Sequence, residues 1–403
     1  MMALFSIRCY GFYMEKKVVL KPGREKPIYN RHPWIFSGAV DKISSHDNGE
    51  ILRVFSSQGK MLGYGYFNQN CSLMGRMVSF GSDDPYKTME NAFLQACGLR
   101  NFLFSASTTN AFRLINGEGD NLPGLVIDKY KNVLVMQIAT LGMEKLKPFF
   151  VELMKKRIKD CDCIYEKSDM SCRKLEGMQD KEEIVFGAFD GKVEIVENNL
   201  RFLVDIIGGQ KTGFFLDQRE MRKMIGEYSH NRHVLNCFSY SGGFSIYGLR
   251  GGAKIADCVD SSKEALFFAD KNFNLNGMDS KGDFYCEDVF SFLKLCESDK
   301  YDLIILDPPA FAKKSNDVER AIKGYRELNK AAIYKLKTPG MLLTCGCSYH
   351  VDNELFQRIL FEVARELGKK MSILSLHRLA LDHPISIFHP ESEYLKSFLL
   401  SIS

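Results

Sequence analysis

Short apolar runs alternate with amphipathic segments through the carboxyl half of the chain. The predicted strands fall at residues 233–238, 254–259, 282–286, 302–306, 341–345, 371–380 and 398–402. Segments with a helical apolar period fill the intervals, for example at residues 264–276 and 318–336. Strands that alternate with helices at this spacing are typical of βαβ units around a parallel sheet. The pattern therefore predicts an α/β fold, with a Rossmann-like, doubly wound domain over residues 198–403.

The amino-terminal part has a different pattern. From residue 16 to residue 82, short apolar runs are separated by turns rich in glycine, which predicts a small β-barrel. Its predicted strands fall at residues 18–20, 51–55, 62–67 and 73–80. Residues 83–197 mix helical periods with short strands, which predicts an α+β connector domain. Residues 1–15 lack the sustained apolar region of a signal peptide. We interpret them as a disordered extension, and the alternative is that translation starts at Met14, directly before the first basic cluster.

Two segments of the connector have no clear period. The polar, highly charged residues 167–183 predict a loop. Gly117-Glu-Gly-Asp120 predicts a tight β-turn, because the helix that a phosphate-binding loop or an EF-hand requires does not follow it. The two helices of the connector are expected at residues 91–104 and 143–157.

The overall composition is ordinary for a soluble globular protein, but the charge is unevenly distributed. The formal net charge is +4, whereas residues 1–80 hold eleven Lys or Arg against five Asp or Glu. Cations interleaved with aromatic residues in this part suit phosphate contacts and base stacking. The predicted RNA-binding cations are Lys21, Arg24, Lys26 and Arg31. A solvated basic face is the alternative, and Trp34, the only tryptophan, is predicted to be a core residue of the barrel.

The twelve cysteines show no disulfide or metal-binding framework. The close pairs, Cys161 with Cys163 and Cys345 with Cys347, are separated by one residue, too little for the C-x-x-C spacing of a metal site. This favours reduced thiols in a cytoplasmic protein without a metal site. No stretch approaches the roughly 18 apolar residues of a membrane-spanning helix, so no membrane partner is predicted.

Ligand-binding residues are expected where the predicted strands of the carboxyl-terminal domain end. The first strand runs into Ser239-Tyr-Ser-Gly-Gly-Phe244, whose glycines would let a ligand approach the backbone at a helix N-terminus. The second ends at Asp260, whose carboxylate suits both hydroxyls of a ribose, and the third ends at Asp288, which suits an adenine amine. The fingerprint G-x-G-x-x-G is absent, which disfavours a nicotinamide oxidoreductase and favours another adenosyl cofactor.

The fourth strand ends at Asp307-Pro-Pro-Ala-Phe311, an acidic residue on a rigid loop that also carries an aromatic ring. With three further segments, this loop resembles the class I S-adenosylmethionine-dependent methyltransferases. Those segments are Gly208-Gly-Gln-Lys-Thr-Gly-Phe-Phe-Leu-Asp-Gln-Arg219, Thr344-Cys-Gly-Cys-Ser-Tyr-His350 and the ending His383-Pro…Glu393-Tyr-Leu-Lys396. The stretch from Lys21-Pro-Gly-Arg-Glu-Lys to Arg31-His-Pro-Trp-Ile-Phe-Ser-Gly38 resembles the start of a PUA domain. From about Lys16 onward, the chain is similar to bacterial 23S ribosomal RNA cytosine-5 methyltransferases with an N-terminal PUA domain.

The resemblance implies S-adenosylmethionine as the cofactor, large-subunit ribosomal RNA as the partner and C5 of a cytosine as the methyl acceptor. It places the nucleophile that adds to C6 at Cys347, with Cys345 as a packed core thiol. Asp307 is the second predicted catalytic residue, and Pro309 and Phe311 are predicted to contact the flipped base. The loop has no cysteine of its own, so product release would depend on Asp307 or water.

The resemblance also implies a set of cofactor-binding positions. They are Lys211, Thr212, Phe215, Asp217, Arg219, Asn236, Phe238, Ser239, Tyr240, Ser241, Gly242, Gly243, Asp260, Ser261, Asn276, Asp288, Val289, Asp307 and Pro308. Among these, Arg219 is expected to hold a phosphate or the carboxylate of the cofactor.

Several points stay open on the sequence alone. Gly346 stands where the family often has serine, which is expected to loosen the segment. His350 is interpreted as a loop histidine or a phosphate contact rather than as a partner of Cys347. The alternative functions are a base-nitrogen methyltransferase of ribosomal or transfer RNA and a non-catalytic RNA-binding assembly factor. A homodimer also remains open.

Overall fold

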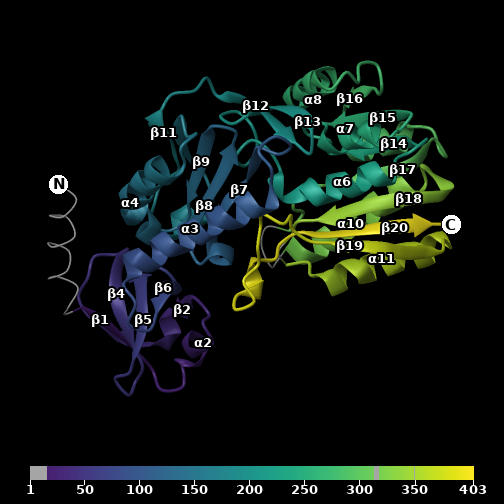
Figure 1. Cartoon of the computed structure of the whole chain (residues 1–403). Helices are drawn as coiled ribbons and strands as arrows, with labels where there is room; N and C mark the ends of the chain where they lie inside the picture. Colours follow the sequence, from purple (N-terminus) through teal and green to yellow (C-terminus); the bar gives the residue numbers. More distant parts are fainter. Residues whose placement is uncertain (1–15, 313–316, 349) are drawn as a thin grey trace. The chain divides into compact units, whose positions relative to one another are not determined.

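The computed structural model describes residues 16–312, 317–348 and 350–403, which fall into two compact units (Figure 1). The first holds the chain up to Val193 together with Asp205–Phe214 and Asp382–Ser392. The second holds Glu194–Val204, Phe215–Leu381 and Glu393–Ser403. The predicted extension, residues 1–15, lies outside the described residues. None of the described helices is long and apolar enough to cross a membrane.

A seven-stranded sheet forms the centre of the second unit, in the order β16-β15-β14-β17-β18-β20-β19 (Figure 1). Its strands are β14 (His233–Cys237), β15 (Ile255–Asp260), β16 (Phe284–Cys286), β17 (Tyr301–Leu306), β18 (Leu336–Gly346), β19 (Met371–His377) and β20 (Lys396–Ile402). The strands from β16 to β18 are parallel neighbours, whereas β20 is antiparallel to both β18 and β19. The chain starts in the middle of the sheet and proceeds outward in both directions, which confirms the predicted doubly wound α/β fold.

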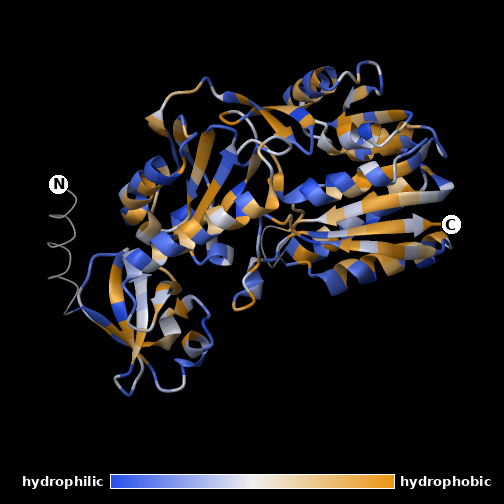
Figure 2. Cartoon of the chain, viewed as in Figure 1, coloured by the Kyte–Doolittle hydropathy of each residue, from blue (hydrophilic) through white to orange (hydrophobic). Residues whose placement is uncertain are grey.

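Helices cover both faces of this sheet. One face carries α6 (Arg219–Glu227), α7 (Gly243–Arg250) and α8 (Lys263–Leu275), and the other carries α9 (Val289–Leu295), α10 (Val318–Ile333) and α11 (Asn353–Leu367). In β17, Leu303 and Ile305 pack on the side of α6 and α7, whereas Ile304 and Leu306 pack on the opposite side. All four side chains are fully buried, which explains the continuous apolar run. Hydrophobic residues accordingly concentrate along these strands (Figure 2).

The first unit begins with a six-stranded sheet in the order β2-β6-β5-β4-β1-β3. Its elements are β1 (Lys17–Leu20), α2 (Lys26–Tyr29), β2 (Trp34–Phe36), the 3-10 turn η1 (Ser37–Ala39), β3 (Val40–Ile43), β4 (Glu50–Phe55), β5 (Met61–Phe67) and β6 (Leu73–Phe80). The core of this sheet includes Val18, Leu52 and Phe67. The edge strands β2 and β3 are three and four residues long, too short to show an apolar run in the sequence.

The prediction that Trp34 belongs to this core is wrong. Side chains alternate along β2, so Ile35 is buried in the core while Trp34 is half-buried on the opposite side. There its indole N–H donates to Glu118 Oε1 at 3.0 Å, and its ring centroid lies 4.3 Å from that of His389. Trp34 therefore connects the six-stranded sheet to other parts of the first unit.

A five-stranded sheet in the order β11-β10-β9-β8-β7 forms most of the rest of the first unit. Its elements are α3 (Pro85–Leu103), β7 (Ala111–Asn116), the 3-10 turn η2 (Gly117–Asp120), β8 (Leu125–Tyr130), β9 (Val133–Ile138), α4 (Leu141–Arg157), β10 (Cys163–Ser168), α5 (Cys172–Leu175) and β11 (Lys181–Gly187). The predicted β-turn is thus a 3-10 turn, and the predicted loop at residues 167–183 is wrong at both ends. β11 is an edge strand with mostly exposed side chains, so its sequence is polar and shows no apolar alternation.

A hairpin crosses the expected domain boundary between residues 197 and 198. β12 (Lys192–Glu197) and β13 (Leu200–Asp205) pair through a turn in which Asn198 and Asn199 have φ values of 49° and 64°. A type I′ turn requires positive φ at both central residues, and asparagine tolerates it better than most residues. The chain therefore forms an ordered hairpin rather than a linker at this position.

The segment Asp382–Ser392 belongs to the first unit, although the chain on both sides of it belongs to the second. Arg100, a fully buried residue of α3, holds it by donating from Nη2 to the Asp382 carbonyl at 2.6 Å. The same guanidinium forms a two-pronged ion pair with Asp120, at N–O distances of 2.6 and 2.8 Å. The domain expected over residues 198–403 is therefore interrupted by this docked segment.

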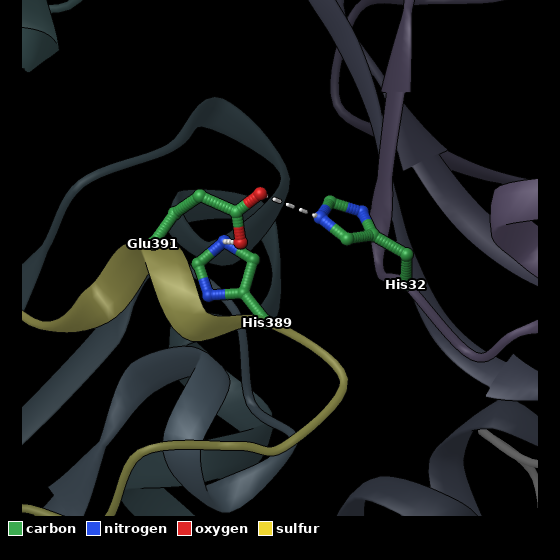
Figure 3. Close-up of side chains that lie close together, drawn as sticks. All are labelled: His32, His389 and Glu391. Carbon is green, nitrogen blue, oxygen red and sulfur yellow. Dashed lines mark hydrogen bonds and ion pairs between the residues drawn. The ribbon is translucent and has the colours of Figure 1, made fainter.

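His32, His389 and Glu391 come together where the docked segment meets the six-stranded sheet (Figure 3). Their ligand atoms lie within 4.8 Å of one another, a spacing that could hold a metal ion. However, His32 Nδ1 accepts the Trp34 backbone N–H at 3.2 Å, which leaves the proton on Nε2, 3.4 Å from Glu391 Oε1. A protonated nitrogen is not a metal ligand, so we interpret the three residues as a hydrogen-bonded contact that secures the segment.

Replacing Arg100 by methionine should destabilise the first unit, because Asp120 would stay buried without its partner. We expect the free energy of unfolding to fall by about 3–5 kcal/mol. Trp34 lies in this unit and contacts the docked segment through His389, so its fluorescence during urea unfolding is the measurement. The double variant Arg100→Met/Asp120→Leu should recover much of the loss. Equal stability of the single variant and the wild type would contradict this role of the ion pair.

Candidate active site

The carboxyl ends of β14, β15, β17 and β18 lie along one edge of the seven-stranded sheet, because these strands are parallel neighbours. β14 runs into the turn at residues 238–242, which α7 follows directly. Gly242 has a φ of +79°, and a Cβ there would come within 3.1 Å of the Ala269 Cβ, so this position requires glycine. Phe238 and Tyr240 also have positive φ, 59° and 47°, which is uncommon for residues with a side chain. The first predicted ligand position is thus a tightly folded turn at a helix N-terminus.

Asp260, the last residue of β15, lies beside that turn. Its Oδ2 accepts the Tyr240 N–H and its Oδ1 accepts the Ser262 N–H, both at 2.9 Å. Each oxygen has a second lone pair, so the fixed carboxylate can also accept the two hydroxyls of a ribose. The Phe215 ring stands edge-on to Tyr240, with ring centroids 5.3 Å apart. Phe215, Tyr240 and Asp260 are therefore brought together, as the sequence predicts.

A buried polar group beneath the turn also fits an adenosyl cofactor. Asn236 is fully buried, and its Nδ2 donates to Ser245 Oγ at 3.1 Å, whereas its Oδ1 has no hydrogen-bond partner among the residues that the structure describes. An orphaned buried acceptor is rare in folded proteins. The other predicted residues of the turn, Ser239, Ser241 and Gly243, are buried or half-buried. A glycine-bearing turn, a fixed carboxylate and a spare acceptor at one strand edge fit the implied S-adenosylmethionine.

Asp288 is exposed, and β16 ends two residues before it, at Cys286. Its Oδ1 accepts the Ser291 N–H at 2.9 Å and caps α9. Ser261 is exposed as well, whereas Val289 is buried in the core of the sheet. Asp288 and Ser261 therefore present polar side chains to the surface, and the Val289 side chain is already used in packing.

The structure brings the Asp307 loop and the Cys347 segment together. Cys347 Sγ lies 3.5 Å from the carbonyl oxygen of Pro308, to which the thiol can donate. On the far side of the thiol, Ser348 Oγ accepts the Ala312 N–H at 3.2 Å. The two segments are therefore joined at Cys347 and again at Ser348.

Asp307 has a neighbour that sequence reasoning missed. Gln218, in the 3-10 turn η3 (Leu216–Gln218), is buried and donates from Nε2 to Asp307 Oδ2 at 2.7 Å. Beside it, Asp217 accepts the Tyr394 hydroxyl at 2.5 Å. The available signal for Gln218 was its place within residues 208–219, the segment that carries part of the family resemblance.

The two thiols of the C-x-C segment have different environments. Cys345 is fully buried in β18, and burial raises its pKa well above the ordinary value, whereas Cys347 follows the strand and is half-buried. Gly346, between them, is buried and paired with Lys396 of β20. A Cβ at Gly346 would lie 3.2 Å from Phe356 Cε2. A side chain at position 346 would therefore require the Phe356 ring to shift by a few tenths of an ångström, and the expected loosening of the segment stays a prediction. His350 is exposed.

Phe311 packs against α10 while lining an open hollow of about 610 Å³. Its ring centroid lies 4.8 Å from that of Tyr325, and a Cβ at Gly324 would lie 3.0 Å from its Cδ2. The hollow is lined by Phe290, Ala310, Phe311, Asp317, Arg320, Lys323, Gly324 and Glu327. Pro309 is exposed on the same loop, and Pro308 is buried. The aromatic ring is thus held in place beside an accessible space.

Two predicted cofactor residues are engaged elsewhere. Arg219 is buried and pairs with Glu197 at an Nε–Oε2 distance of 3.3 Å, and Arg222 holds the same carboxylate with hydrogen bonds of 2.9 and 2.8 Å. Asn276 is the residue at the carboxyl end of α8. Its Oδ1 accepts the Arg201 backbone N–H, and its Nδ2 donates to the Arg201 carbonyl. Since α8 leads away from the strand ends, Asn276 lies toward the opposite edge of the sheet. These side chains hold β12 and β13 against helices, and their assignment to the cofactor stays a prediction.

The remaining predicted residues lie in the first unit. Thr212 is buried, where its Oγ1 donates to Asp128 Oδ2 at 2.6 Å and lies 2.8 Å from the Tyr130 hydroxyl. Lys211 is exposed. The predicted RNA-binding cations are exposed in this unit as well, at Lys21, Arg24, Lys26 and Arg31.

Comparison with known proteins agrees with this geometry. Residues 179–380 match the family model of S-adenosylmethionine-dependent methyltransferases, and residues 18–80 match that of PUA-like domains. Curated relatives named ribosomal RNA large subunit methyltransferase I occur in Erwinia tasmaniensis and Escherichia coli. Each is 38% identical over 395 residues, which cover 96% of this chain and 99% of the relative.

Solved structures have the same fold. SMU.776, a protein assigned to the methyltransferases and crystallised with S-adenosylhomocysteine, gives a TM-score of 0.81 at 23% identity, and the match covers 96% of this chain and 99% of that chain. A structure from Streptococcus mutans, titled as an S-adenosylmethionine-dependent methyltransferase, gives a TM-score of 0.80 at 23% identity over the same shares of the chains. Sequence, fold and strand-end geometry thus agree, and this chain belongs to the ribosomal RNA large subunit methyltransferase I family of S-adenosylmethionine-dependent methyltransferases, with a PUA-like domain in its first unit.

Proposed function

We propose that this protein transfers the methyl group of S-adenosylmethionine to C5 of a cytosine in large-subunit ribosomal RNA, with Cys347 as its single nucleophilic thiol. The observation that carries the proposal is the 3.5 Å approach of Cys347 Sγ to the Pro308 carbonyl, directly beside Asp307. A thiol, a carboxylate and a rigid loop then share the strand edge that also holds the predicted cofactor residues. The names of the curated relatives supply the class of RNA.

C5 of cytosine is a poor nucleophile, so the reaction needs an activating group. Bound S-adenosylmethionine supplies an electrophilic methyl group on a sulfonium centre. The Cys347 thiolate adds to C6, and the electron pair of the C5–C6 double bond becomes available at C5. That pair forms the new bond to the methyl carbon while the methyl–sulfur bond breaks and leaves its electron pair on the sulfur of the departing thioether. A base then removes the C5 proton, the double bond forms again, and the C6–S bond breaks with its electron pair returning to Cys347.

Asp307 is suited to orient the base. Gln218 fixes the carboxylate through the 2.7 Å hydrogen bond to Oδ2, and the carboxylate can accept the exocyclic amine of a flipped cytosine. That contact would fix the orientation of the base relative to the Cys347 thiol. Because residues 307–312 contain no cysteine, the C5 proton leaves to Asp307 or to water.

The first unit is suited to hold the RNA backbone. Lys21, Arg24, Lys26 and Arg31 are exposed within the residues that match a PUA-like domain. Exposed cations bind phosphates without reading bases, so they position an RNA rather than select its sequence.

Replacing Cys347 by alanine should abolish cytosine-5 methylation while leaving cofactor binding intact. We expect the rate to fall by about 10³-fold or more, because the covalent route is removed. Ribosomal RNA from cells that lack the gene is incubated with enzyme and S-adenosylmethionine and digested to nucleosides, and 5-methylcytidine is quantified by mass spectrometry.

Cys345→Ala is the matched control, since it removes a buried thiol two residues away and should retain most of the activity. Calorimetry should give the same affinity for S-adenosylhomocysteine in both variants and the wild type. A Cys347→Ala protein that still forms 5-methylcytidine would contradict the proposal, as would a wild type that forms only N-methylated bases. A wild type that binds no cofactor would favour a non-catalytic assembly factor instead.

Exchanging the four exposed cations of the PUA-like domain for glutamine should weaken RNA binding without changing the affinity for the cofactor. The positions are Lys21, Arg24, Lys26 and Arg31. Each lost phosphate contact should reduce the slope of log K against log salt concentration by about 0.7–0.9. Fluorescence anisotropy of a labelled ribosomal RNA fragment at several salt concentrations measures both the affinity and the slope.

The same change of charge at the end of α4 provides the control, at Lys155, Lys156, Arg157 and Lys159, which are exposed in the same unit. This variant should have nearly the affinity and the salt slope of the wild type. The only loss expected is the small one that follows from its lower net charge. Equal losses in the two variants would show that net charge alone acts, and the assignment of the RNA-binding cations would fail.

A further inference from the structure

Lys396, the first residue of β20, is a buried lysine next to the proposed nucleophile. Only 6% of the residue is exposed. Its Nζ donates to the backbone carbonyls of Ser348 and Tyr394, at 3.0 and 3.1 Å. β20 pairs with β18 so that Lys396 lies opposite Gly346, one residue before Cys347.

No ion pair explains the burial of this ammonium. Moving a charged group out of water is unfavourable unless a counter-charge compensates the loss of hydration. Among the described residues, no carboxylate lies within ion-pair distance of Lys396 Nζ. Burial lowers the pKa of Lys396, and the opposing influences come from Cys347, then from Glu393 and Asp352. Cys347 is therefore one of the ionisable groups that lie near the lysine.

Other groups around Cys347 oppose its ionisation. The thiol is placed to donate to the Pro308 carbonyl, which favours the protonated form. Asp307 and Asp217 are carboxylates close enough to add to the effect of burial in raising the pKa of the neighbouring Cys345. An ordinary thiol has a pKa of about 8.5 and is mostly protonated at neutral pH unless a cation lies nearby.

We propose that Lys396 is a positioning residue for methyl transfer, whose buried ammonium holds Cys347 as a thiolate and fixes the backbone from which the thiol projects. This inference rests on the proposed role of Cys347 in cytosine-5 methylation. Cysteines beside a lysine or arginine ionise more readily, and the effect is larger where water is excluded. The thiolate is in turn the counter-charge that the buried lysine lacks.

The backbone contact connects the same lysine to the substrate loop. Ser348, whose carbonyl accepts from Lys396, also holds the Ala312 N–H through its Oγ, which lies 3.0 Å from the Tyr325 hydroxyl. Burial raises the pKa of Tyr325 to about 12, so this hydroxyl stays neutral and adds no charge near the thiol. Loss of Lys396 should therefore release the Cys347 segment as well as remove a positive charge.

Thiol reactivity tests the inference without requiring activity. Trypsin releases residues 338–358 as one peptide that holds both Cys345 and Cys347, so mass spectrometry can follow the alkylation of each by iodoacetamide. In the wild type, Cys347 should react at pH 7 while the buried Cys345 does not. In Lys396→Met, the pH at which Cys347 reacts at half its maximal rate should rise by about one unit or more, which slows its reaction about tenfold at pH 7.

Lys335→Met is the matched control, because Lys335 also donates to a backbone carbonyl, that of Cys296, just before β18 begins. It should leave the reactivity of Cys347 unchanged, and Lys396→Arg, which keeps the charge, should preserve it. Lys396→Gln keeps a hydrogen-bond donor without the charge and replaces the methionine variant if that protein fails to bind S-adenosylhomocysteine. An unchanged pH profile of Cys347 in the neutral variant would overturn the inference.

Activity separates this inference from the proposed function. In the neutral variants, formation of 5-methylcytidine should fall at pH 7 and recover toward the wild-type rate at about pH 9–10. A purely structural role would lower the rate at every pH, and that result would also overturn the inference. If Cys347 shows the expected shift in reactivity but the wild type makes no 5-methylcytidine, the effect of the lysine on the thiol stands and the proposed function fails.

Discussion

The parallel pairing of β17 with β18 places the two proposed catalytic groups at one point. Leu306 lies opposite Thr344, so the residues that follow these positions emerge at the same edge of the sheet. Asp307 follows directly on one strand, and Cys347 follows on the other after the buried Cys345 and Gly346. Both strands are buried, and a shift of register by one residue would turn every side chain to the other face. The packing of the sheet therefore fixes the distance between the substrate loop and the thiol.

Uncharged groups hold two of the charged side chains at this edge. Gln218, a neutral donor, holds Asp307, and two backbone carbonyls hold Lys396. In these contacts neither the carboxylate nor the ammonium is neutralised by an opposite charge. In contrast, Arg219 and Arg222 both pair with the carboxylate of Glu197.

The sheet of the second unit could be predicted because strands that are buried on both faces have continuous apolar sequences, as β17 does. The edge strands β2 and β11 could not, because one is three residues long and the other is largely exposed and polar. The docking of Asp382–Ser392 depends on Arg100, nearly three hundred residues earlier, and no local pattern records such a contact. Gln218 and Lys396 lie in segments that carry the family resemblance. The sequence does not show which groups their side chains contact, because those contacts depend on the three-dimensional placement of neighbouring segments. For the same reason the ion pair between Arg219 and Glu197 could not be read from the sequence.

The central claim is that methyl transfer passes through a bond between Cys347 and C6 of the target cytosine. A large-subunit ribosomal RNA fragment that carries 5-fluorocytidine tests it most directly. Release of Cys347 from C6 requires loss of a proton from C5, and fluorine at C5 cannot leave in this way. The enzyme therefore stays covalently attached to the RNA. After incubation with S-adenosylmethionine, denaturing electrophoresis and peptide mapping should reveal a cofactor-dependent complex joined through Cys347, within residues 338–358. Methylation of the unsubstituted RNA without any trapped complex, or a complex joined through another residue, would contradict the claim.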